Sequence, residues 1–118
     1  MKNRLFLNRM EFALNGIRSA WSSERSFRTQ CLFGTAAVLA LLVLRPGLFW
    51  SALIIIMIAL VLAAELMNSA IEGLVDRLHP EVHPAIKIVK DMAAGAVLLL
   101  SAASLIVGLL MLISLFWK

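Results

Sequence analysis

The chain of 118 residues contains one cysteine, Cys31, so it can form neither an intrachain disulfide nor a multi-cysteine metal site. It also lacks both glycine-rich phosphate-binding patterns of soluble nucleotide-binding proteins, GxxxxGK(S/T) and GxGxxG. Charged residues make up only 15% of the chain, and none lies between residues 92 and 117. A disulfide framework and a soluble fold built on a phosphate loop are therefore excluded.

Apolar residues make up 62% of the chain, whereas about 45–50% is usual for a soluble domain. They fall into three long stretches, and each is long enough to cross about 30 Å of hydrocarbon as a helix. We therefore predict an all-α integral membrane protein that forms a single membrane domain over residues 1–118. The predicted transmembrane helices cover residues 31–49, 51–77 and 85–117.

Basic residues are distributed unevenly about these stretches. Most precede the first span or surround the loop at 78–90, whereas only Arg45 and Lys118 fall on the other side. The positive-inside rule then places the N-terminus and this loop in the cytoplasm and the C-terminus outside. We attribute the net charge of +4 to this topology and to attraction for anionic lipids, and expect no nucleic-acid partner.

Residues 5–28 have a different pattern, in which apolar and aromatic residues alternate with polar and basic ones at helical spacing. This pattern predicts an amphipathic helix that lies in the membrane interface. The serines at 22 and 23 indicate a break near its end, because serine caps a following helical turn.

A polar stripe runs along the second predicted span, formed by Glu65, Asn68, Glu72 and Asp76. At about 100° per residue the four side chains lie within roughly 80° of one another. A charge near the bilayer centre costs about 2.5–3.5 kcal/mol on insertion scales, so the stripe indicates a function. From periodicity alone it could be an oligomer seam, a proton or cation pathway, or part of an enzymatic site.

Further polar residues are expected near the same membrane surface. Carboxylates with a lysine suit a hard divalent cation and a polyphosphate, because Mg²⁺ is bound by a few carboxylates together with phosphate oxygens and water. The residues alone do not name the reaction. The full set is Glu24, Glu65, Asn68, Glu72, Asp76, Glu81, His83, Lys90 and Asp91.

Three segments carry a family resemblance. The stretch from Ala64 to Glu72, followed by Asp76, resembles the ELxNxAIExxxD signature of the prokaryotic diacylglycerol kinase family. The segment that begins at His83 and contains KDMAAGAVL is similar to that family's third membrane helix, and ERSFR at 24–28 is similar to the end of its surface helix.

This resemblance implies a homotrimer in the bacterial inner membrane, each subunit with a surface helix and three transmembrane helices. It implies transfer of the γ-phosphate of MgATP to a lipid hydroxyl at the cytoplasmic interface, with diacylglycerol as the leading substrate and undecaprenol as the alternative. A non-enzymatic trimeric membrane protein or ion conductor on the same scaffold is the alternative from another class.

The resemblance also implies individual roles. Glu65 would be the catalytic base and Asn68 would support the catalytic geometry, whereas Asp76 would have a supporting role. Two arginines match the family's arginine near the start of the surface helix, Arg4 and Arg9, and we choose Arg9. The carboxylates that hold Mg²⁺ would be Glu24 and Glu72, and the residues that bind the nucleotide would be Glu81, His83, Lys90, Asp91 and Arg9.

Overall fold

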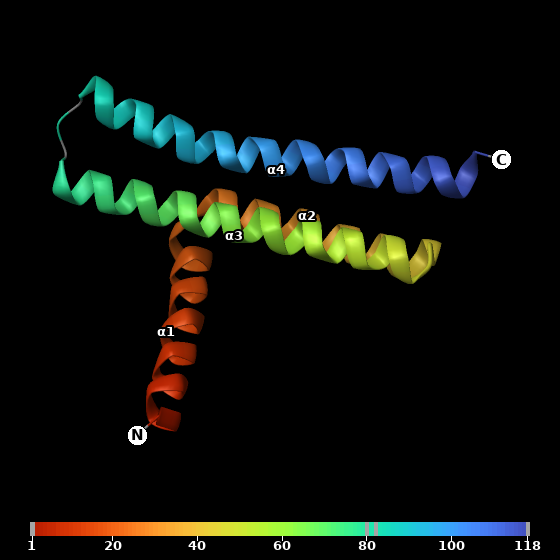
Figure 1. The fold of residues 1–118 in the computed structure, drawn as a ribbon, viewed down its shortest axis with the longest axis horizontal. Coiled ribbons are helices and arrows are strands. Elements are labelled where there is room, and N and C mark those ends of the chain that lie inside the picture. The colour runs from red at the N-terminus through yellow and green to blue at the C-terminus, as the bar shows by residue number, and fades with distance from the viewer. Residues whose placement is uncertain (1, 80, 82, 118) are drawn as a thin grey trace.

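The computed structural model describes residues 2–79, 81 and 83–117, with side chains from residue 5 onward. Four helices follow one another in the chain: α1 (Lys2–Ser23), α2 (Arg25–Leu44), α3 (Leu48–Leu78) and α4 (Pro84–Phe116). Helices α2, α3 and α4 run side by side, whereas α1 crosses their common direction near one end (Figure 1). Each of these three helices is long and apolar enough to span a membrane, as predicted.

The corner between α1 and α2 is held by an arginine. Helix α1 ends at Ser23, and Glu24 has extended dihedral angles before α2 begins. Arg28 Nη1 donates to the carbonyl oxygens of Trp21 (2.7 Å) and Ser22 (3.2 Å). These carbonyls belong to the last turn of α1, where no backbone N–H of the same helix is available to donate to them. The break predicted at the serines is present, but residues 25–28, which we had placed in the surface helix, form the first turn of α2.

The turn between α2 and α3 lies at the opposite end of the bundle. Arg45 has left-handed dihedral angles (φ 49°), and its backbone N–H donates to the carbonyl of Leu41 at 3.0 Å. Gly47 has a φ of 101°, a conformation that glycine adopts readily. Pro46 cannot continue a helix, since it lacks the backbone donor. Helix α2 therefore ends at Leu44, whereas the sequence-based helix extended to residue 49.

Helix α3 is the central element and contacts α2 on one side and α4 on another. Leu41, Ile54 and Met111, one from each of these helices, form the buried cluster that joins them. Most other large apolar side chains are exposed on the chain, among them Val43 and Leu48. Exposed apolar surface on this scale is expected where lipid or other subunits cover a protein.

Candidate active site

Glu65 is the one charged side chain that is buried among the described residues, with 4% of its surface exposed. Two donors from α2 hold its carboxylate. Ser26 Oγ donates to Oε2 at 3.2 Å, and Gln30 Nε2 donates to Oε1 at 3.4 Å. The structure therefore fixes both the position and the orientation of the Glu65 carboxylate.

The depth of Glu65 follows from helix length. Helix α3 has 31 residues, or about 46 Å at 1.5 Å per residue, which exceeds the roughly 30 Å of a bilayer's hydrocarbon. Counted from Leu48, the first 20 residues cross that layer and Glu65 lies about 26 Å along it. With the hydrocarbon taken to begin at Leu48, the buried carboxylate falls close to its other boundary, and Glu72 and Asp76 fall beyond it.

Asn68 and Glu72 are adjacent on the next turn of α3. Asn68 Nδ2 donates to Glu72 Oε1 at 3.5 Å, and the buried Asn68 Oδ1 has no hydrogen-bond partner among the described residues. Carboxylate and amide oxygens are ligands that Mg²⁺ accepts, so this pair fits the predicted metal. Glu24 precedes α2 and is partly buried. Within the described ranges, no three His, Cys, Asp or Glu side chains gather closely enough to hold a metal ion.

Two ion pairs organise the start of α4. Lys90 Nζ lies 2.7 Å from Asp76 Oδ1 and so connects α4 to the polar stripe of α3. Lys87 Nζ lies 2.7 Å from Asp91 Oδ2 within α4, and both of these side chains are largely exposed. Exposed pairs contribute little to stability. These two pairs instead fix the positions of Lys90 and Asp91, two predicted nucleotide-binding residues, at one end of the bundle.

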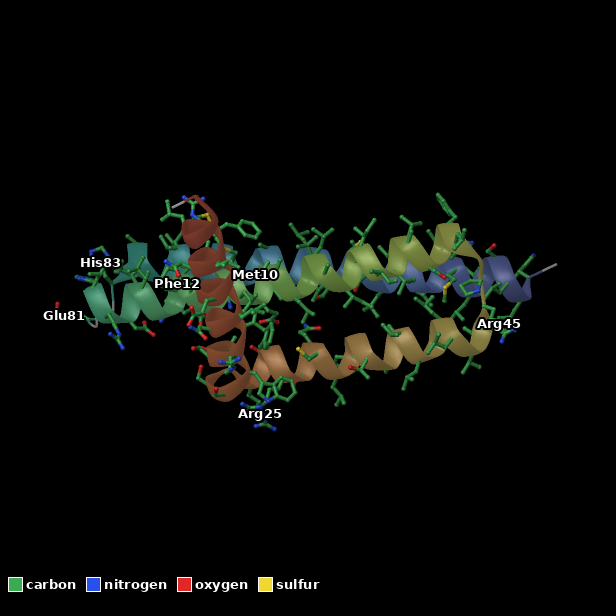
Figure 2. All side chains as sticks on the ribbon, turned by 90° about the horizontal axis from the view of Figure 1, so that it is seen from below. Met10, Phe12, Arg25, Arg45, Glu81 and His83 are labelled. Carbon is green, nitrogen blue, oxygen red and sulfur yellow. The ribbon has the colours of Figure 1, made fainter. Side chains whose placement is uncertain are left out.

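The remaining predicted nucleotide ligands are exposed. Glu81 and His83 lie between α3 and α4, at the end of the molecule opposite Arg45 (Figure 2). His83 Nδ1 accepts a hydrogen bond from the backbone N–H of Ala85 at 3.1 Å and thereby caps α4. Arg9 is exposed on α1. The structure thus brings Lys90 to Asp76 but does not join Glu81, His83 and Arg9 to the buried carboxylate.

Sequence reasoning missed the two donors to Glu65. Ser26 and Gln30 are four residues apart, so they lie on one face of α2, and that face meets α3. Two polar residues at this spacing beside an apolar run could have indicated a polar contact with another helix. Their partner could not be read from it, because the contact depends on how α2 is rotated and shifted against α3. Lys87, the partner of Asp91, was also missed.

Comparison with known proteins places this arrangement in context. The sequence profile of the prokaryotic diacylglycerol kinase family matches residues 11–112, which include every predicted site residue except Arg9. The chain belongs to this family. The resemblance seen in the polar stripe of α3 is thereby confirmed over most of the chain.

Named family members cover the chain to different extents. It is 37% identical over 98 residues to a diacylglycerol kinase of Synechocystis, which is 82% of this chain and 56% of that relative. It is 36% identical over 91 residues to a diacylglycerol kinase of Escherichia coli, covering 75% of this chain and 72% of the relative. It is 32% identical over 108 residues to an undecaprenol kinase of Bacillus subtilis, covering 92% of this chain and 87% of the relative. The chain therefore spans little more than half of the Synechocystis relative.

Proposed function

We propose that this member of the diacylglycerol kinase family is a lipid kinase that transfers the γ-phosphate of MgATP to the hydroxyl of diacylglycerol, forming phosphatidic acid. The observation that carries the proposal is the buried, doubly hydrogen-bonded carboxylate of Glu65 in a helix long and apolar enough to span a membrane. At that depth a carboxylate meets a lipid headgroup rather than a soluble substrate. The printed names of the relatives, diacylglycerol kinase and undecaprenol kinase, support the same reaction class.

In the proposed mechanism, Glu65 is the general base. It accepts the proton of the lipid hydroxyl while that oxygen attacks the γ-phosphorus, and the bond between this phosphorus and the bridging oxygen of ADP breaks. A base must lie within hydrogen-bond reach of the proton it removes. Ser26 and Gln30 act as positioning residues, because each fixes one oxygen of the Glu65 carboxylate. Asn68, three residues along α3, supports this geometry.

Glu72 and Glu24 are the proposed Mg²⁺ carboxylates, with the unpartnered Asn68 Oδ1 beside Glu72 as a further oxygen. When bound, the ion neutralises the negative charge of the phosphate oxygens. Lys90, Asp91, Glu81, His83 and Arg9 are the proposed nucleotide contacts. Asp76 supports Lys90 through their ion pair.

We further propose that the protein is a homotrimer in the bacterial inner membrane, with the N-terminus and the α3–α4 connection in the cytoplasm and the C-terminus outside. Helix α1 is then the amphipathic surface helix. One subunit does not gather three metal-ligating groups among its described residues, so a site shared between neighbours supplies the missing partners. The large exposed apolar surface of α2, α3 and α4 is consistent with such an assembly.

Undecaprenol is the second candidate substrate. The specific observation in its favour is the Bacillus relative, whose match covers more of this chain than those of the two diacylglycerol kinases above. Transfer of labelled phosphate from MgATP to diacylglycerol and to undecaprenol, measured side by side with protein in bilayers, distinguishes them. Glu65→Gln is the inactive blank, and Glu11→Gln on the exposed part of α1 is the matched control. Dominant transfer to undecaprenol would keep the mechanism and change the substrate.

The same preparation tests the non-enzymatic alternative. Ion flux in liposomes without ATP, together with no phosphate transfer to either lipid, would overturn the kinase proposal. The proposed nucleotide contacts Glu81, His83, Lys90 and Asp91 favour a kinase over a conductor, since an ion pathway has no need of nucleotide-facing groups at the membrane surface.

A further inference from the structure

An apolar cavity of about 570 Å³ lies against α3, between α2 and α4. Helices α2 and α4 flank α3 on different sides, so α3 forms the floor of the cavity. Its lining is overwhelmingly apolar and contains several small residues, including Gly34, Ala37 and Gly108. The polar exceptions are Gln30, Ser101 and Ser104.

The polar part of the cavity lies at the level of the candidate active site. Gln30 lines the cavity and also donates to Glu65. The register of α4 against α3 is fixed by the ion pair of Lys90 with Asp76 and by the packing of Met111 with Ile54. Because the two helices are antiparallel, Ser101 then lies at the level of Glu65.

The hydroxyl of Ser101 supports this placement. Ser101 Oγ is buried and has no hydrogen-bond partner among the described residues, whereas Ser104 donates to the carbonyl of Ser101 at 2.7 Å. A buried hydroxyl without a partner carries an unfavourable free energy. A polar group of a bound molecule at this end of the cavity would relieve it.

The cavity also has the depth of one membrane leaflet. Its lining on α4 extends from Ser101 to Leu112, which is 11 residues, or about 16 Å along the helix. One leaflet contains roughly 15 Å of hydrocarbon, half of a bilayer's 30 Å. An apolar space that begins beside Gln30, a donor to Glu65, and extends over the depth of one leaflet matches a lipid chain whose polar end is near the Glu65 carboxylate.

We infer that this cavity holds an apolar chain of the lipid whose hydroxyl Glu65 activates, and that Gly108 sets the length of chain that fits, an inference that rests on the proposed function. Gly108 lies seven residues beyond Ser101 on α4, about 10 Å farther from the active site. A Cβ added at Gly108 meets no described atom within 4 Å outside its own helix backbone. A larger side chain there enters open space instead of colliding with the protein.

The test measures kcat/KM of wild type, Gly108→Ala, Gly108→Leu and Gly108→Phe on two diacylglycerols in mixed micelles. Dihexanoylglycerol has chains that end before Gly108, whereas the chains of dioleoylglycerol extend past it. We expect the ratio of kcat/KM for dioleoylglycerol to that for dihexanoylglycerol to fall stepwise along the series. In Gly108→Leu this ratio should be at least about tenfold lower than in the wild type, the usual effect of one methylene group too many or too few in an apolar pocket.

Ala102→Leu is the matched control, because it adds bulk at an exposed position of the same helix, and it should leave the ratio unchanged. An unchanged ratio in Gly108→Leu and Gly108→Phe, or an equal loss on both lipids, would overturn the inference while the kinase assignment stands. Dissociation of the assembly by Gly108→Leu, seen by light scattering in detergent, would also overturn it, because the cavity would then be a seam between subunits. If the wild-type protein phosphorylates neither lipid, the proposed kinase function itself is contradicted.

Discussion

Removal of the two donors to Glu65 gives a quantitative test of the site. Ser26→Ala removes the hydrogen bond to Oε2, and Gln30→Leu removes the one to Oε1. Hydrogen bonds to charged groups contribute about 1.5–3 kcal/mol. Ser26 is exposed, and the Gln30 contact of 3.4 Å is longer than the usual 2.9–3.0 Å or so. We therefore expect about 1–1.5 kcal/mol from each donor, which is roughly a five- to tenfold loss in kcat.

The assay is phosphate transfer to diacylglycerol over a range of ATP concentrations, so that kcat and KM are separated. If Ser26 and Gln30 position the base, kcat falls and the KM for ATP stays constant. Thr29→Val is the matched control. It removes a hydroxyl from the same turns of α2, but that hydroxyl donates to the carbonyl of Arg25 within its own helix.

A wild-type kcat in both Ser26→Ala and Gln30→Leu would refute the positioning argument. An equal loss in Thr29→Val would refute it as well, because the effect would then belong to the helix and not to the carboxylate. Gln30→Glu should reduce kcat further than Gln30→Leu, since it places a second carboxylate beside Glu65.

Three other predictions concern the metal, the nucleotide and the packing of α2. Glu24→Gln and Glu72→Gln should each raise the Mg²⁺ concentration for half-maximal activity by about tenfold or more, and a wild-type Mg²⁺ titration in both would remove them from the metal site. Asp76→Asn should raise the KM for ATP with little change in kcat or thermal unfolding, because it releases Lys90 from an exposed ion pair; an unchanged KM would contradict the supporting role. Gly34→Leu should lower the free energy of unfolding by about 1–3 kcal/mol, since an added Cβ lies 3.0 Å from Ile58 Cγ2. Denaturation of Gly73→Leu, where no described atom lies within 4 Å of an added Cβ, is the comparison, and equal destabilisation of both variants would refute the packing argument.

The order of the helices and the polar stripe could be predicted from the sequence because both depend on local patterns. Long apolar runs gave three membrane-length helices, and the helical period placed Glu65, Asn68, Glu72 and Asp76 along α3. The end of the first span was placed at residue 49 instead of Leu44, because the apolar run continues past Pro46 and Gly47, although both residues interrupt a helix.

The boundaries and partners that depend on contacts between helices could not be predicted. Arg25 and Arg28 made the start of α2 look like the end of an interfacial helix. The Arg28 side chain in fact reaches back to carbonyls of α1 from inside α2. The donors to Glu65 and the pairing of Lys90 with Asp76 depend on interhelical register. One sequence contains no direct signal for that register.

The account's central claim is that Glu65 is the base of a lipid kinase. The most direct measurement is phosphate transfer from MgATP to diacylglycerol by wild type and Glu65→Gln, reconstituted in bilayers and checked for equal assembly by light scattering. Glu65→Gln keeps the shape of the side chain and removes its proton-accepting carboxylate. The account predicts transfer by the wild type, and an intact assembly without measurable transfer in the variant. A Glu65→Gln protein that turns over at the wild-type rate would contradict it.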